Sequence, residues 1–478
     1  MIEVAVAFVV LFLLLFLEVP IAFGMALVGF LGLIHFLDVH AAFSVVGNEA
    51  FGQILKYDFA VLPLFILMGN FIAQSRISND LYDASHAWVG HTRGGLATAT
   101  IMACGGFSAV CGSSLATAAT MTKVAMPSMR RFGYANSLAA GSIAAGGTLG
   151  ILIPPSVALV FYGIMTDVDI GKLFAAGFIP GLLGMLLYIV AILAVTTVRP
   201  ELGPAADRTP WRQRILALRG VWGMLLLFSI VMGGIYFGVF SPTESAGIGA
   251  FGALLIGWLK GSLTPRAPQG IWPFVRWAMS GFRNSQHRKD TGAFLAAPFV
   301  RRGFDWRVVN RVLTETGRTS AALFTILIGS LIFANFINVS QVPNDLATWF
   351  KEANYAPLAV LFLIVAIYIL LGCILESISM MLLTVPVFYP IVQAMDFGLS
   401  GPEETLIWFG IVVVVVIEIS LITPPIGLNV FVLKSLLPEV PVTTLFKGVI
   451  PFICADVVRT VSIIFVPWLA LFLPRLVN

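Results

Sequence analysis

Two apolar segments of the chain each carry a pair of adjacent prolines. The first reads GTLGILIPPSVALVFYG, with Pro154 and Pro155, and the second reads IEISLITPPIGLNVFVL, with Pro424 and Pro425. A proline removes a backbone donor and clashes with the preceding turn, so each segment predicts a helix that breaks at the pair. Carbonyls freed at such breaks can hold a cation, and the positive ends of half-helices can face an anion. The chemistry indicated is binding of ions and solutes.

Hydroxyl groups gather beside these breaks. The run CGGFSAVCGSSLATAATMTKVAMPSM contains Ser113, Ser114 and Thr117, while Ser156 follows the first proline pair and Thr423 precedes the second. Such hydroxyls can coordinate a hard cation such as Na⁺ together with backbone carbonyls. The alternative is that the small residues only allow close packing of helices in a membrane.

Acidic side chains in apolar segments are the other candidates. Glu376 and Ser377 lie in LGCILESISMMLLTVPVFYP, and Glu418 precedes the second proline pair. A carboxylate inside a membrane is unfavourable, so Glu376 is expected to hold a cation or take up a proton. A hairpin tip near water is the alternative for Glu376, and an internally paired carboxylate is the alternative for Glu418. The basic residues of apolar segments are interpreted as snorkelling near span ends: Lys123, Lys434 and Arg459.

Several other classes of function find no support. The chain has no Walker A motif and therefore is not expected to hydrolyse ATP, and its five histidines match no metal spacing. We expect no cofactor, no nucleic acid partner and no enzymatic activity; an intramembrane enzyme would have only Glu376 and Glu418 to use. The N-terminus lacks the features of a removable signal peptide. The cysteines are expected to be small buried hydrophobic residues: Cys104, Cys111, Cys373 and Cys454.

The elements that position these residues follow from composition. The chain has 478 residues, of which 59% are hydrophobic and 11% charged, and its mean hydropathy is +0.96. About 20 apolar residues cross a bilayer. An all-α polytopic membrane protein is therefore predicted, embedded in a lipid bilayer. The predicted crossings are 3–18, 20–37, 57–75, 137–164, 173–198, 221–240, 243–260, 319–340, 405–436 and 447–473.

Two longer stretches, 95–128 and 355–395, exceed one crossing. Basic residues concentrate in 199–219 and 260–318, which the positive-inside rule places in the cytoplasm. All of these basic loops can lie in the cytoplasm only if each long stretch is a re-entrant hairpin, one entering from each face of the membrane. Both termini then lie outside. The sequence therefore predicts an inverted repeat with two hairpins and two broken helices.

This arrangement divides the chain into four parts. Residues 1–56 form N-terminal scaffold helices, and 57–198 form the first repeat, with its hairpin at 95–128 and its broken helix at 137–164. Residues 199–318 hold scaffold helices and a basic connector, which lies along the membrane surface or forms a solvated loop. Residues 319–478 form the second repeat, with its hairpin at 355–395 and its broken helix at 405–436.

The motifs resemble a known family. The runs GSSLATAATMTKVAMPSMRRFGY, AGGTLGILIPPS, FYGIMT, IGKLFAAGFIPGLL, VLPLFILMGNFIA, LLTVPVFYPIV and IEISLITPPIGLNVFVLKS extend over nearly the whole chain. In combination they resemble the DctM-like large membrane subunit of tripartite ATP-independent periplasmic (TRAP) transporters.

The resemblance implies an elevator-type carrier in the bacterial inner membrane, in which a transport domain slides against a scaffold. It implies import of small organic anions such as C4-dicarboxylates or sialic acid, driven by an ion gradient, typically Na⁺. The implied partners are a periplasmic solute-binding protein and a small four-helix membrane subunit, which we expect to be a separate chain.

The resemblance also assigns residues. The cation sites would use Ser113, Ser114 and Gly147 in the first half, and Glu376, Ser377, Thr423 and Gly427 in the second. The substrate is expected beside Ser114, Thr117, Pro154, Pro155, Ser156, Pro424 and Pro425. Family members commonly carry an aspartate where this chain has Glu376. The other hypotheses are a stand-alone anion or metalloid carrier and a structural membrane scaffold.

Overall fold

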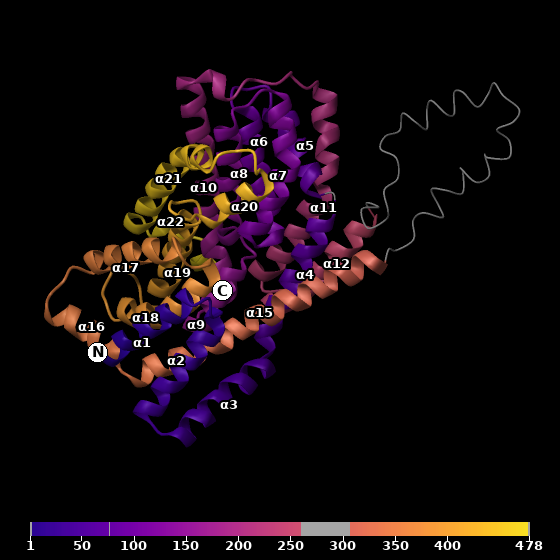
Figure 1. Ribbon diagram of the computed structural model, residues 1–478. Helices are drawn as coiled ribbons and strands as arrows, with labels where there is room; N and C mark the ends of the chain where they lie inside the picture. Colours follow the sequence, from indigo (N-terminus) through magenta and orange to yellow (C-terminus); the bar gives the residue numbers. More distant parts are fainter. Residues whose placement is uncertain (1, 76, 260–305, 477–478) are drawn as a thin grey trace, which may run out of the picture.

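Every element in the described part of the chain is helical. The computed structural model describes residues 2–75, 77–259 and 306–476, and no strand occurs among them (Figure 1). The predicted connector therefore lies outside the described residues over 260–305.

The N-terminal region contains more helices than predicted. It comprises α1 (Ile2–Phe16), α2 (Ile21–Phe36), α3 (Val39–Leu55), α4 (Val61–Gln74) and α5 (Ile77–Val89). The sequence analysis did not predict α3 or α5, because both are too polar to be identified by hydropathy alone. The Asp38 side chain caps α3 by accepting a hydrogen bond from the Ala41 amide at 2.8 Å.

The first predicted hairpin is present. Helix α6 (Gly95–Cys111) ends at Gly112, and α7 (Ser114–Arg131) begins just after it. Gly112 has a φ of +64°, in the left-handed region that glycine adopts without a steric penalty. The chain therefore reverses direction within two residues, and this tip carries Ser113.

The second predicted hairpin is also present. It consists of α17 (Pro357–Gly372) and α18 (Ser377–Gln393), joined by residues 373–376. The Glu376 carboxylate caps α18. The tip of this hairpin therefore carries the acidic residue that the sequence analysis singled out.

Both proline pairs lie where a helix is interrupted. The first break separates α8 (Asn136–Leu152) from α9 (Val157–Thr166), and the second separates α19 (Pro402–Ser420) from α20 (Leu428–Leu436). The Pro154–Pro155 and Pro424–Pro425 peptide bonds are both cis. The second break is the longer one, so more of its backbone lacks helical partners.

The remaining helices surround these elements. They are α10 (Ile170–Val198), α11 (Trp211–Tyr236), α12 (Pro242–Leu259), α15 (Trp306–Val339), α16 (Val342–Glu352), α21 (Val442–Phe465) and α22 (Trp468–Leu471), with short 3₁₀ turns at Tyr57–Ala60, Pro200–Leu202 and Pro474–Leu476. Helix α15 lies along α2 and α4, and α12 packs against α4 and α11 (Figure 1). Helix α15 begins at Trp306, inside the stretch that the sequence analysis assigned to the connector.

Five helical segments of the described residues are long and apolar enough to cross a membrane: α8–α9 taken together, α10, α11, α15 and α21. In the crossing window of α8–α9, 83% of residues are buried inside the protein, against 28% in α10. The first broken helix therefore occupies the centre of a polytopic membrane protein. The ten crossings, their orientation and the division into four parts stay predictions.

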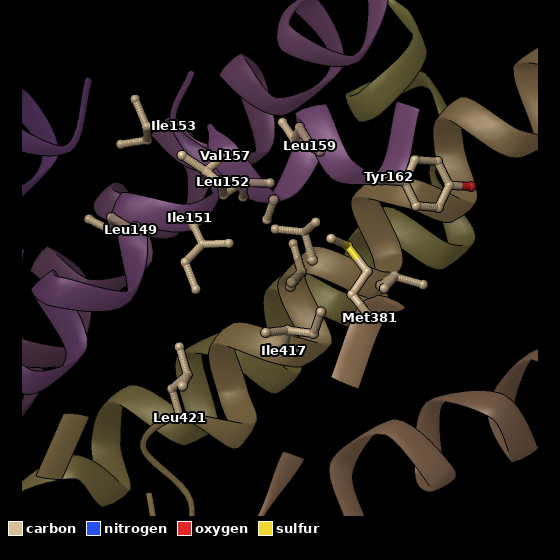
Figure 2. Close-up of a cluster of buried hydrophobic side chains, with 14 of the residues drawn as sticks. Leu149, Ile151, Leu152, Ile153, Val157, Leu159, Tyr162, Met381, Ile417 and Leu421 are labelled. Carbon is tan, nitrogen blue, oxygen red and sulfur yellow. The ribbon is translucent and has the colours of Figure 1, made fainter. Parts of the chain in front are cut away.

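The two halves interlock through their hairpins. Helix α7 of the first hairpin packs against α20, and α18 of the second hairpin packs against α9. Each hairpin therefore lies against the broken helix of the other half. Apolar side chains of both halves form one buried cluster, which includes Leu149, Leu152 and Tyr162 of the first broken helix together with Met381 of α18 and Ile417 of α19 (Figure 2).

Candidate ion and solute site

The tip of the first hairpin lies directly against the first break. A Cβ atom added at Gly112 would lie 2.9 Å from the Pro155 carbonyl oxygen, and one added at Gly150 would lie 2.8 Å from the Ser113 carbonyl oxygen. Only residues without a side chain allow this approach, because real Cβ contacts are not so short. The hairpin tip and the break thus form one compact unit.

The predicted hydroxyls of this half occupy that unit. Ser113 Oγ accepts a hydrogen bond from the Ala116 amide at 3.4 Å, and Thr117 Oγ1 donates to the Ser113 carbonyl at 2.8 Å. Ser114 and Thr117 are buried. Gly147 packs against Ala118, since an added Cβ would lie 2.7 Å from the Ala118 Cβ. The structure therefore places these residues at the contact between α7 and α8.

The first break itself is enclosed by protein. Pro154, Pro155 and Ser156 are all buried. Ser156 Oγ donates to the Ile151 carbonyl and accepts from the Leu159 amide, so it caps α9 and also bonds across the break. This hydroxyl therefore satisfies backbone groups that the break leaves without helical partners.

Glu376 at the second hairpin tip has a clear local role. Its Oε2 atom accepts hydrogen bonds from the Ile378 and Ser379 amides, both at 3.1 Å, and from Ser379 Oγ at 3.2 Å. The carboxylate is half-buried and complements the positive end of α18. Ser377 is buried in the first turn of α18.

The tip of the second hairpin also lies against the break of its own half. Cys373 Sγ donates to the Pro424 carbonyl at 3.5 Å, and Gly372 lies against Ser420. Thr423 Oγ1 donates to the Ile419 carbonyl at 2.6 Å. Gly427 has a φ of +57° and starts α20. The arrangement of the first half is therefore repeated in the second.

The two breaks differ in their exposure. Pro424 and Pro425 are exposed and Thr423 is half-buried, whereas the prolines of the first break are buried. The structure thus divides the predicted substrate residues into a buried set in the first half and an accessible pair in the second.

One polar residue that the sequence analysis missed joins the two halves. Asn429 is fully buried on α20, and its Nδ2 atom donates to the Ala144 carbonyl of α8 at 3.1 Å. Its backbone amide donates to the Leu421 carbonyl at 3.1 Å, across the second break. An asparagine in an apolar segment just after a proline pair was the available signal.

The interpretation of Arg459 as a snorkelling side chain was wrong. Its side chain has no exposed surface and pairs with Glu418 and, at 2.7 Å, with Asp456 Oδ1. Arg459 lies within α21, and Gly184 of α10 leaves room for its guanidinium group. The alternative for Glu418, a carboxylate paired inside the protein, is confirmed.

Of the remaining predictions for single residues, some are confirmed and others are wrong. Lys434 Nζ donates to the Pro438 and Val440 carbonyls beyond the end of α20, as expected for a lysine near a helix end. Cys104 and Cys111 are buried as predicted, but Cys373 is half-buried and Cys454 is exposed. The error at Cys454 arises because apolar helices expose many of their side chains on the outer surface of this fold.

Ion pairs outside the apolar segments connect distant elements. Arg130, at the end of α7, pairs with Glu439 after α20, and this hydrogen bond lowers the pKa of Glu439. Arg475 bonds both oxygens of Glu404 at 2.8 Å, which lowers the pKa of Glu404. Lys172 Nζ lies 2.7 Å from Glu403. The pairs of Arg130 and Lys172 join the two halves of the chain, and the pair of Arg475 joins α19 to the C-terminal turn of the same half.

Comparisons with known proteins identify the family of this chain. A family model described as "Tripartite ATP-independent periplasmic transporter, DctM component" matches residues 8–469. The C4-dicarboxylate TRAP transporter large permease protein DctM of Pseudomonas aeruginosa is 33% identical over 420 residues, covering 88% of this chain and 86% of that protein. The sialic acid TRAP transporter large permease protein SiaM of Vibrio cholerae is 29% identical over 464 residues, covering 97% and 96%.

A solved structure shares the fold. The Alcanivorax borkumensis YdaH transporter aligns with a TM-score of 0.60 and 17% sequence identity, covering 91% of this chain and 90% of that one.

Proposed function

Because this chain belongs to the DctM component family of tripartite ATP-independent periplasmic transporters, we propose that it is the permease subunit of a secondary active importer of small organic anions. The importer acts in the bacterial inner membrane. Its relatives carry names that specify C4-dicarboxylates, sialic acid and ectoine, so carboxylate-bearing solutes are the proposed substrate class.

The observation that carries the proposal is the contact of each hairpin tip with the backbone break of its own half. Four helices begin at these places: α7 at Ser114, α9 at Val157, α18 at Ser377 and α20 at Leu428. Helix N-termini carry partial positive charge and favour anions. Glu376 already occupies the N-terminus of α18, and the start of α9 is buried. The anion is therefore proposed at α20, beside the exposed second break, with α7 packed against it.

Na⁺ is the proposed coupling ion. Hard cations select oxygen ligands, and unwound backbone supplies carbonyls that no helix bond uses. In the first half the proposed ligands come from Ser113, Ser114 and Gly147. In the second half they come from Glu376, Ser377, Thr423 and Gly427; the Thr423 carbonyl oxygen would lie 3.2 Å from a Cβ added at Gly427.

Alternating access is proposed to follow an elevator motion. The hairpins and broken helices interlock across the two halves and would move as one unit past the surrounding helices. Substrate is proposed to arrive from a periplasmic solute-binding protein, and a small four-helix membrane subunit, encoded as a separate chain, completes the carrier.

Reconstitution tests the proposal. The chain is incorporated into lipid vesicles with its small subunit, and uptake of a labelled C4-dicarboxylate or sialic acid is measured with the binding protein outside. Uptake should require an inward Na⁺ gradient and the binding protein. Ser113→Ala and Thr423→Ala should raise the Na⁺ concentration needed for half-maximal uptake, whereas Ser462→Ala, a half-buried hydroxyl on α21 that donates to the Val458 carbonyl, should not. Uptake that needs neither Na⁺ nor binding protein would instead identify a stand-alone carrier and contradict the proposal.

A further inference from the structure

Two carboxyl groups share one guanidinium in the helical core. Glu418 of α19 and Asp456 and Arg459 of α21 have no exposed side-chain surface. In the described part of the chain these are the two acidic side chains that are buried. If both were ionised, the cluster would carry a net negative charge in a medium of low dielectric constant, which is strongly unfavourable.

The contacts of Asp456 favour its ionised form more strongly than the contacts of Glu418 do. Its Oδ2 atom accepts a hydrogen bond from the Tyr188 hydroxyl of α10 at 2.6 Å, and its Oδ1 atom lies 2.7 Å from Arg459 Nη2. The Tyr188 hydroxyl also lies 3.1 Å from Thr148 Oγ1 of α8. Hydrogen bonds to a carboxylate favour its ionised form. Arg459 is therefore balanced by Asp456.

Only one of the two carboxylate oxygens of Glu418 has a partner. Its Oε2 atom pairs with Arg459, while Oε1 is buried and has no hydrogen-bond partner among the described residues. We propose that Glu418 is a proton-binding site: one proton, taken from water, bonds to the carboxylate and returns to water on release. The bound proton makes the cluster neutral, with Arg459 matched to Asp456.

A proton fits this place better than a metal ion. Hard cations need several oxygen ligands. Within the ranges that the structure describes, two carboxylate oxygens of the cluster have no hydrogen-bond partner, Glu418 Oε1 and Asp456 Oδ1, and the second of them already lies 2.7 Å from Arg459 Nη2. Arg459 Nε and Nη1 also lie there without hydrogen-bond partners, and their positive charge opposes a metal ion.

The groups that face Glu418 are Asp456 and Arg459 from α21 and Tyr188 from α10. Other titratable side chains packed on α19 are engaged elsewhere. The Tyr162 hydroxyl of α9 donates to the Leu406 carbonyl at the opposite end of α19, and the Tyr368 hydroxyl of α17 accepts from Thr384.

The site lies between the two breaks. Glu418 precedes the second break on α19, and the hydrogen-bonded chain through Asp456 and Tyr188 reaches Thr148, just before the first break on α8. Loss of the proton would leave an unbalanced charge among four packed helices. Proton binding and close packing of these helices are therefore linked, and each favours the other.

Infrared spectroscopy tests the proposal on the purified full chain in a detergent without ester groups. At neutral pH the wild-type protein should show the carbonyl band of a protonated carboxyl group, shifted in D₂O. The band should disappear in Glu418→Gln and persist in Glu376→Gln, the half-buried control.

Absence of the band from the wild-type protein would overturn the proposal. This outcome does not depend on whether any variant folds. Persistence of the band in folded Glu418→Gln would assign the proton to another group. The spectra need no transport, so their outcome is separate from that of the vesicle experiments.

Discussion

The side-chain amide of Asn429 donates to the carbonyl oxygen of Ala144 at 3.1 Å and joins the two broken helices inside the protein. The two residues are separated by 285 positions in the chain. Asn429 lies two residues after Gly427, where the second break ends, and Ala144 lies on the helix that leads to the first break. The hydrogen bond therefore joins the helix that precedes the first break to the helix that follows the second.

Removal of that hydrogen bond should destabilise the fold. Asn429→Ala deletes a buried amide and leaves a small cavity, with an expected loss of roughly 1–3 kcal/mol. Thermal unfolding in detergent measures the effect as a lower apparent melting temperature. Asn344→Ala removes an exposed amide from α16 and should change stability by less than about 0.5 kcal/mol. Equal melting temperatures for the two variants would contradict the role of Asn429.

Arg459→Met should be far more damaging than removal of a surface arginine. It leaves Glu418 and Asp456 buried without their guanidinium partner, and breaking a buried pair in this way typically costs about 3–5 kcal/mol. Arg475→Met removes an exposed partner of Glu404 and should have a much smaller effect.

Expression yield and unfolding temperature measure both arginine variants. A stable, well-folded Arg459→Met would show that the buried cluster does not hold α19 against α21.

Contact between the first hairpin tip and the first break can be tested at Gly112. Gly112→Ala forces a left-handed conformation, which costs about 1–2 kcal/mol for an alanine, and also places a methyl group against the Pro155 carbonyl. Gly133→Ala is a matched control, because Gly133 has a φ of +75° and open space around it.

Both glycine variants carry the same backbone penalty, so the difference between them isolates the contact. Uptake assays in vesicles should show a larger loss for Gly112→Ala. Equal losses would mean that the packing of the tip against the break does not matter for transport.

Acid should reduce the stability that the ion pairs of Glu404 and Glu439 contribute to the fold. The pKa of Glu404 is lowered below its ordinary value of 4.5 by its hydrogen bonds from Arg475, and the pKa of Glu439 is lowered by Arg130. A carboxyl group with a lowered pKa in the folded state stabilises the fold above its unfolded-state pKa. That contribution is lost as the pH falls through the folded-state pKa.

Melting temperatures measured between neutral pH and about pH 3 should therefore fall less steeply in the double variant Glu404→Gln, Glu439→Gln than in the wild-type protein. An identical pH profile in both proteins would show that these two ion pairs do not contribute.

The sequence predicted the interrupted elements well because they follow from local chemistry. Proline pairs cannot continue a helix, so both breaks were placed correctly. The hairpins followed from length and from the distribution of basic residues. Glycine at position 112 then lets the first hairpin reverse within two residues.

The buried cluster was missed for a different reason. Arg459 was interpreted as snorkelling near a span end, although it falls at the middle of the predicted crossing 447–473 and closer to an end in α21, which ends at Phe465. Its burial follows from packing against Glu418 of α19 and Gly184 of α10, and not from its position along the helix. Its partner Glu418 lies 41 positions away, and sequence spacing does not reveal such pairs. The unequal exposure of the two breaks likewise depends on which helices cover them.

Direct measurement of Na⁺ binding tests the central claim that the hairpin tips and breaks form the ion sites. Binding of ²²Na⁺ to the purified protein is measured for the wild type, for Ser113→Ala and Thr423→Ala, and for the control Ser462→Ala on α21. Saturable binding that weakens severalfold in the first two variants and is unchanged in the control is the predicted result. Equal binding in all four proteins, or no saturable binding in the folded wild type, would contradict it.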